Sequence, residues 1–426
     1  MPSAPPALPS PTPATPLARA AVALAFWVTM AGTTVPTPLY PIYQQAFGFS
    51  PLMVTVTFAV YAVGVVAGLL TLGRLSDRIG RRPVMAGALL LAAAAAGLFE
   101  AASALPWLLV ARVVSGLAAA LITGAATAAL LDLAPPERRL RAQTLALAAN
   151  MGGLAGGTLL SGALAEWAGS PLRLPWTVML ALTAAALLGL LAVPESVPRN
   201  TPATTRATTS AATATTAPGP RPGFQPLHVP AGIRPAFLRA ALSAGSGFAV
   251  LGVLTSVSGL FLATVLGLHH HALTGLVVCL AFAATAVGQL LARVLPGPRA
   301  LPAACTGLVL AAALIATALL TESLAPLLLG ACVNGLATGT AVGTGLGAIN
   351  GGVEPQGRGA AVSTFFAVLY AMLSVPVVGV GVLIRTTDLR TAGVVFSALV
   401  ALLAFGVAAG LTGRRRRPTA ALAEEA

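Results

Sequence analysis

The sequence predicts an all-α integral membrane protein in which twelve transmembrane helices form two related six-helix bundles. Composition, the number of apolar runs and an internal repeat support this prediction. Of the 426 residues, 57% are hydrophobic and 8% are charged, and the mean hydropathy is +0.90. A soluble domain carries about 25% charged residues. The chain therefore has too little polar surface for water, and we expect lipid as its solvent.

Twelve runs are long enough to cross a hydrocarbon core of about 30 Å, which needs about 20 apolar residues. In the first half they are 18–36, 54–75, 84–102, 107–131, 141–167 and 174–193. In the second half they are 236–266, 272–295, 300–320, 324–350, 359–384 and 391–411. Unpaired backbone groups are too costly in lipid, so each run is expected to be a helix.

The flanking segments are polar or rich in proline. Residues 1–17 lack the basic region of a secretory signal and predict a disordered cytoplasmic tail, which leaves bundles at 18–193 and 234–412. Residues 194–233, rich in Thr, Ala and Pro, predict a flexible cytoplasmic linker, and 413–426 a basic tail. The first run ends with Pro36, Pro38 and Pro41, so its outer end either bends or passes into a loop.

An internal repeat relates the two halves. Residues 108–118 align with 327–337 at an offset of 219, and Pro136 and Arg139 have counterparts at Pro355 and Arg358. At an offset of 215, 288–293 is a weaker echo of 73–78, in which Ala292 replaces Asp77. The charged residues are therefore concentrated in the first half.

The distribution of arginine predicts the orientation. All 24 basic residues are arginine, a bias typical of GC-rich bacterial genomes. If the N-terminus is inside, twenty lie on the cytoplasmic side, three lie outside, and Arg112 lies within a span. We therefore expect a multi-pass protein of the bacterial plasma membrane with both termini in the cytoplasm. The basic residues sit between apolar runs instead of on one soluble face, which argues against nucleic-acid binding.

The sequence predicts no cofactor, no metal and no enzymatic activity. Cys279, Cys305 and Cys332 each lie inside an apolar run, and three adjacent histidines at 269–271 have poor chelate geometry. The chain has no lysine and no phosphate-binding loop, so ATP cannot drive it directly.

A charged loop lies between the second and third runs. It reads Gly-Arg-Leu-Ser-Asp-Arg-Ile-Gly-Arg-Arg, and its constrained positions are Gly73, Asp77, Arg78, Gly80, Arg81 and Arg82. This pattern resembles the loop signature of the major facilitator superfamily, G-x-L-a-D-r-x-G-r-k. The spans, the linker and the repeat agree with that family, so the resemblance covers nearly the whole chain and implies the superfamily's fold of two six-helix bundles.

The resemblance implies that Asp77, Arg78 and Arg81 form a conformational latch, in which the acid docks on a helix end of the opposite half in the inside-closed state. Asp132 follows the fourth run and is the candidate partner of Arg78 or Arg81. Two simpler interpretations stay open. The arginines could serve topology alone, and Asp132 could be a solvated helix end.

Arg112 is expected about 8 Å inside the membrane along the fourth span, where a charge costs a few kcal/mol. The spacing from Arg112 to Gly116 resembles the R-x-x-x-G signature that the family links to proton coupling. The alternative is that Arg112 snorkels to the outer interface.

The fifth span contains two pairs of glycines one helical turn apart, Gly152 with Gly156 and Gly153 with Gly157. They predict a smooth face for close helix packing. They resemble the glycine-rich fifth-helix motif of drug:proton antiporters. That motif normally contains a Gly-Pro pair, and no proline occurs here between Pro136 and Pro171. Tight packing explains the glycines equally well.

Polar residues within the spans are candidates for a central substrate cavity, and they are Tyr61, Asn150, Ser246, Gln289, Asn334 and Tyr370. The leading hypothesis is a monomer that exports small, largely apolar compounds by proton antiport. The alternative, an uptake symporter or facilitator for a neutral metabolite such as a sugar, predicts polar and aromatic cavity walls. A third class, a receptor that does not transport, would tolerate loss of Arg112. No carboxylate lies near the centre of a span, so the proton acceptor is unassigned, with Glu100 as one candidate.

Overall fold

The computed structural model describes residues 16–73, 75–195 and 229–412, and every element in these ranges is a helix. The first half contains α1 (Pro16–Thr34), α2 (Pro36–Phe47), α3 (Pro51–Leu72), α4 (Leu75–Ile79), α5 (Arg81–Glu100), α6 (Leu105–Asp132), the 3₁₀ helix η1 (Pro136–Arg138), α7 (Arg139–Trp167) and α8 (Leu174–Leu190). The second half contains the 3₁₀ helix η2 (Ala231–Ile233), α9 (Arg234–Thr264), α10 (His271–Val294), α11 (Gly297–Thr321), α12 (Leu324–Gly352), α13 (Pro355–Thr386) and α14 (Leu389–Thr412). The predicted all-α fold is confirmed.

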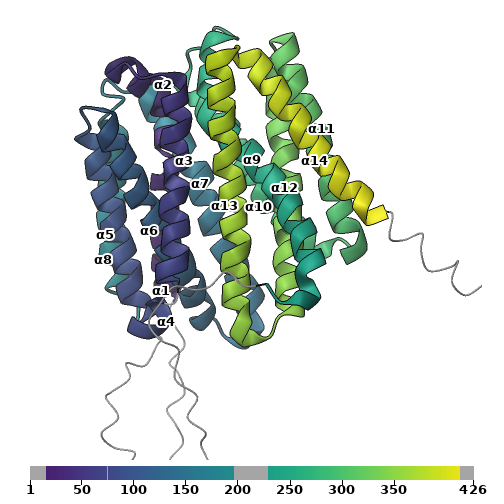
Figure 1. Ribbon diagram of the computed structural model, residues 1–426. Helices are drawn as coiled ribbons and strands as arrows, with labels where there is room; N and C mark the ends of the chain where they lie inside the picture. The colour runs from purple at the N-terminus through teal and green to yellow at the C-terminus, as the bar shows by residue number, and fades with distance from the viewer. Residues whose placement is uncertain (1–15, 74, 196–228, 413–426) are drawn as a thin grey trace, which may run out of the picture.

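The long helices run alongside one another, with the first half in purple and blue beside the second half in green and yellow (Figure 1). We call the end with α4 and the start of α1 the linker end, and the end with α2 the far end. Most of the predicted linker and nearly all of both predicted tails lie outside the described residues.

Within the described residues, ten helices are long and apolar enough to cross a membrane when α1 and α2 count as one span, Pro16–Phe47. Of the twelve predicted spans, two fall short of this criterion. Helix α8 is apolar but has 17 residues. Helix α7 has 29 residues, but it carries two arginines and several glycines. Since α7 packs between α1 and α10, it needs less apolar surface than a helix that lipid surrounds.

The first span continues beyond its prolines, so the loop alternative was wrong. Val35 keeps α-helical angles, φ −48° and ψ −41°, and its N–H still bonds the Ala31 carbonyl at 3.2 Å. Pro36 then begins α2, at a position where a helix has no use for its own N–H group. The prolines interrupt the hydrogen-bond ladder between α1 and α2 without ending the helical path.

Close helix contacts repeat between the halves. A Cβ atom at Gly116 would overlap the Tyr61 carbonyl oxygen. Because glycine has no Cβ, α6 can lie directly on α3. Gly335 lies 219 residues later, and a Cβ there would overlap the Ala281 carbonyl oxygen. The glycine therefore lets α12 lie directly on α10. The two halves therefore share a packing scheme that keeps glycine where the backbones meet.

Candidate functional site

A cavity of about 110 Å³ lies between the two halves. Its walls come from α1, α3, α6 and α7 of the first half and from α9, α10 and α13 of the second. Six aromatic side chains line it, and they are Phe58, Tyr61, Phe248, Phe282, Phe366 and Tyr370. None of the described residues that line it is charged.

Most hydroxyl groups in the wall are already bonded. Thr33, Thr123, Thr255 and Thr285 each donate to a carbonyl of their own helix, at 2.7, 2.7, 2.6 and 2.8 Å. Their protons are therefore not offered to a bound molecule. The rings of Tyr61 and Tyr370, one from each half, meet edge to face with centroids 6.2 Å apart. The wall is thus mainly apolar and aromatic.

Three of the six polar residues predicted for the cavity line it, namely Tyr61, Asn150 and Tyr370. The other three are not among its lining residues. Ser246 donates to the Leu242 carbonyl at 2.7 Å, and Asn334 is buried and donates to the Gly247 carbonyl at 3.3 Å. The backbone of Gln289 lies against α12, where a Cβ at Gly343 would come within 3.6 Å of the Gln289 Cα. Backbone bonding of this kind is common for polar residues in membrane helices.

Arg112 lies directly behind the cavity wall and is 1% exposed. Its Nη1 donates to the Thr33 carbonyl at 2.6 Å, its Nε donates to the Tyr40 hydroxyl at 2.9 Å, and its Nη2 donates to the same hydroxyl. Thr33 lies in α1, two residues before Val35, and Tyr40 lies in α2. The guanidinium therefore joins both segments of the first span to α6, and it does not snorkel to the interface.

Aromatic rings surround the same guanidinium. Its Cζ lies 5.3, 6.0, 5.7 and 5.9 Å from four ring centroids, in the order Tyr40, Phe58, Tyr61 and Phe99. Among the described residues no carboxylate lies within ion-pair distance of Arg112. Glu100 instead accepts a bond from the Thr177 hydroxyl at 3.0 Å. Neutral oxygens and ring faces stabilise the buried charge.

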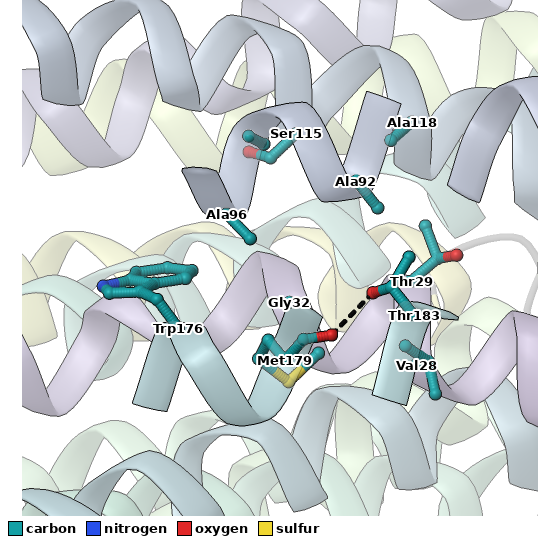
Figure 2. A pocket seen from close by; sticks show the side chains of 11 residues that line it. Val28, Thr29, Gly32, Ala92, Ala96, Ser115, Ala118, Trp176, Met179 and Thr183 are labelled. Atoms are coloured by element: carbon teal, nitrogen blue, oxygen red, sulfur yellow. Dashed lines mark hydrogen bonds between the residues drawn. The ribbon is translucent and has the colours of Figure 1, made fainter. Parts of the chain in front are cut away.

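A second, much smaller space of about 10 Å³ lies inside the first half between α1, α5, α6 and α8 (Figure 2). Gly32, Ala92, Ala96 and Ala118 leave it open because their side chains are short. The Thr183 hydroxyl donates to the Met179 carbonyl at 2.7 Å, the bond drawn in Figure 2. This space lies within one half, whereas the central cavity contacts both, so the central cavity is the candidate site.

The charged loop at the linker end forms a cluster around Arg81. Its Nη1 pairs with the Asp77 carboxylate and donates to the Ser76 hydroxyl at 2.9 Å, and its Nε lies 3.3 Å from an oxygen of Asp132. Arg78 and Arg81 were the two predicted partners of Asp132. The ion pair forms with Arg81, whereas Arg78 is exposed. These contacts all lie within the first half.

Glu195, which follows α8, holds the start of α5. Its two carboxylate oxygens accept the backbone N–H groups of Arg81 at 2.9 Å and Arg82 at 3.1 Å. Gly80 has φ +105°, and a Cβ there would meet the Glu195 carboxylate at 2.6 Å. Gly80 is therefore needed both for its backbone angle and for the approach of this acid. No local pattern points to Glu195, because it lies 114 residues from Arg81.

At the far end, Glu166 of α7 binds the second half. One oxygen lies 2.7 Å from Nδ1 of His270, and the other accepts the backbone N–H of His271 at 2.7 Å. The carboxylate therefore caps the N-terminus of α10 across the interface between the halves. About two turns earlier in α7, the Thr158 hydroxyl donates to the Gly275 carbonyl at 3.1 Å. Sequence reasoning misses this role of the histidines, because no local pattern joins His270 to Glu166, 104 residues away.

The four predicted packing glycines of α7 face α1. A Cβ at Gly153 would come within 2.8 Å of the Met30 Cβ, and one at Gly156 would overlap the ring of Trp27. Gly157 lies against the Ala31 carbonyl, and Gly152 lies beside Trp27. This face serves close packing inside the first half.

Towards the linker end, Arg293 of α10 donates to the Thr144 hydroxyl of α7 at 3.1 Å.

Comparison with known proteins identifies a family match along most of the chain. The sequence profile of the Major Facilitator Superfamily matches residues 22–379. The inner membrane transport protein YnfM of Escherichia coli (strain K12) is 44% identical over 55 residues, which is 13% of this chain and 13% of that protein. The putative multidrug resistance protein MdtD of Klebsiella pneumoniae (strain 342) is 28% identical over 147 residues, which is 34% of this chain and 31% of that protein. The matches thus span less than a third of either relative.

Solved structures share the fold at low sequence identity. A bacterial homolog of the human lysosomal transporter Spinster, in an inward-facing and unoccupied conformation, superposes with a TM-score of 0.68 at 17% identity. That match covers 95% of this chain and 100% of the other. The nucleoside transporter NupG gives a TM-score of 0.66 at 14% identity and covers 92% and 99% of the two chains.

The contact at Glu166 predicts a shift in the equilibrium between conformations. Glu166→Gln removes the charge that caps α10, so the far end should open more often. Double electron–electron resonance can measure the distance between spin labels at Gln45 and His269 in a background without the native cysteines. In Glu166→Gln, a larger fraction of molecules should show a long distance between the two labels.

Glu322→Gln is the matched control, because this far-end acid pairs with Arg390 of its own half at 3.7 Å. It should leave the distance distribution unchanged. An unchanged distribution in Glu166→Gln would show that the contact does not hold the far end closed.

Proposed function

Because the chain belongs to the major facilitator superfamily of membrane transporters, we propose that it is a secondary active transporter that exports small apolar or amphiphilic compounds by proton antiport. It acts as a monomer in the bacterial plasma membrane, with both termini in the cytoplasm. Its cargo occupies the cavity between the halves, which open in turn towards the two sides of the membrane.

The apolar wall of the central cavity is the observation that carries this proposal. The described lining residues include no charge, and the threonine hydroxyls are occupied by their own backbones. A sugar needs many polar partners, because each buried hydroxyl without a hydrogen bond costs about 1–3 kcal/mol. The wall therefore favours an apolar or amphiphilic cargo over a sugar, although its six aromatic rings agree with one part of the uptake hypothesis.

Export is supported by the partial likeness to MdtD, a putative multidrug resistance protein. Proton coupling is supported by the position of Arg112 and by the resemblance of Arg112 and Gly116 to the family's signature. Arg112 contacts Thr33 and Tyr61 in the cavity wall and Tyr40 in α2. A change of charge or occupancy in the cavity can thus alter how α2 is held at the far end.

Two contacts are proposed to govern the alternation. Glu166 closes the far end, and the cluster around Arg81 is the latch at the linker end. In the present state Asp77 bonds Arg81 while its side chain is 59% exposed. We propose that Asp77 exchanges this exposed contact for one with a helix end of the second half when the linker end closes, together with Arg78 and Arg82.

Proton flux in proteoliposomes tests the function. With a panel of uncharged aromatic compounds, we expect protons and compound to move in opposite directions. Arg112→Ala should slow this exchange at least roughly tenfold, since bonds to a charged group contribute about 1.5–3 kcal/mol. Arg173→Ala, which removes an exposed arginine, is the control.

Each other result selects a different function. Movement of protons and compound in the same direction would establish the uptake symporter, and transport without protons would establish a facilitator. A protein that transports none of the panel would favour the receptor. Normal exchange by Arg112→Ala would remove Arg112 from the coupling mechanism.

The latch predicts a separate defect in Asp77→Asn. The exposed pair with Arg81 contributes little to stability, so the variant should reach the membrane in normal amounts. Its turnover should fall roughly tenfold because a charge-assisted bond of the closed state is lost. Glu137→Gln, an exposed acid at the same end, should turn over normally. Wild-type turnover in Asp77→Asn would refute the latch.

A further inference from the structure

The cavity lies beside a buried positive charge that no nearby carboxylate balances. Arg112 is almost wholly buried, and among the described residues its hydrogen-bond partners are a tyrosine hydroxyl and a backbone carbonyl. These partners are neutral, so they satisfy the N–H groups but leave the net charge in place.

The carboxylates of the described residues all lie at helix ends or in loops. They are Asp77, Glu100, Asp132, Glu137, Glu166, Glu195, Glu322, Glu354 and Asp388. None of them lines the central cavity. Several are also engaged elsewhere: Asp77 and Asp132 pair with Arg81, Glu166 binds α10, and Glu322 pairs with Arg390.

The guanidinium lies against two rings that line the cavity, those of Tyr61 and Phe58. The Cζ atom of Arg112 is 5.7 Å from the centre of the Tyr61 ring, and Tyr61 lines the cavity. A molecule in contact with that ring would lie roughly 9 Å from the charge, allowing about 3.5 Å for van der Waals contact. At an effective dielectric constant of about 20, one unit charge at that distance changes an affinity on the order of tenfold.

We propose that this cavity selects its cargo by charge and takes aromatic compounds that are uncharged or singly negative, while it excludes lipophilic cations. The inference rests on the proposed function, since it concerns the cargo of the same cavity. The aromatic wall supplies apolar contact for either sign of charge. The sign is selected by Arg112, because a cation would be repelled and finds no carboxylate in the wall.

Tetraphenylborate and tetraphenylphosphonium provide the test, because they have nearly the same shape and opposite charges. Binding is measured by equilibrium dialysis with the full chain in nanodiscs of zwitterionic lipid, and the uptake by empty nanodiscs is subtracted. We expect tetraphenylborate to bind at least roughly tenfold more tightly than tetraphenylphosphonium.

Variants connect this preference to the cavity and to the charge. Arg112→Gln should bring the two affinities to within about threefold, whereas Arg112→Lys should keep the preference. Arg173→Gln removes an exposed arginine and should change nothing. Tyr370→Ala, in the opposite wall, should weaken both ions equally. Size-exclusion chromatography checks that each variant is folded.

Equal binding of the ions, or tighter binding of the cation, by the wild-type protein would overturn the proposal. Failure of both ions to bind would overturn it as well, because the cavity would then not be a site for aromatic ions. A preference that survives in folded Arg112→Gln would show that Arg112 is not its source. These outcomes are separate from proton flux, which can fail or succeed with either charge preference.

Discussion

The buried guanidinium of Arg112 is the interaction on which the rest of the site depends. A charge inside a membrane costs at least a few kcal/mol unless the protein stabilises it. Here the stabilisation comes from the Tyr40 hydroxyl, the Thr33 carbonyl and four ring faces. Because Thr33 lies before Val35 and Tyr40 lies after it, the first span must keep its helical path past Val35 for the charge to remain buried.

Burial of the Arg112 guanidinium also depends on the close contact between α3 and α6. Arg112 can stack on Tyr61 because Gly116, one turn further along α6, brings the backbone of α3 close. The second half repeats the glycine contact at Gly335 but has the buried Ala331 in place of the arginine. The halves thus share their packing, while the charged groups belong to the first. The weaker echo of the charged loop follows the same rule, with Ala292 in place of Asp77.

The fold was largely predictable from the sequence because a lipid solvent leaves few solutions. Apolar runs must be helices, and the loop at residues 73–82 is specific to one superfamily. Arg112 was recognisable because an arginine within a span needs a reason. Its partners were less accessible, since Tyr40 lies beyond prolines that also fitted a loop.

The sequence could not show which polar residues face the cavity. Spans in this chain are buried on several sides, so position along a helix did not separate Tyr61 and Asn150 from Ser246, Gln289 and Asn334. Long-range contacts such as that of Glu166 with His270 join residues with no shared motif. They depend on how the two halves pack against each other, which local sequence patterns do not indicate.

A double-mutant cycle between Arg112 and Tyr40 tests the central claim most directly. The free energy of unfolding in lipid is measured for Arg112→Gln, Tyr40→Phe and both together, with Tyr43→Phe as the control. Tyr43 also lies in α2, but its hydroxyl accepts from the neutral Nε1 of Trp176 at 2.8 Å. We predict a coupling of at least about 1.5 kcal/mol for Tyr40 and less than about 0.5 kcal/mol for Tyr43. Additive effects at Arg112 and Tyr40 would contradict the account, because the charge would then not depend on α2.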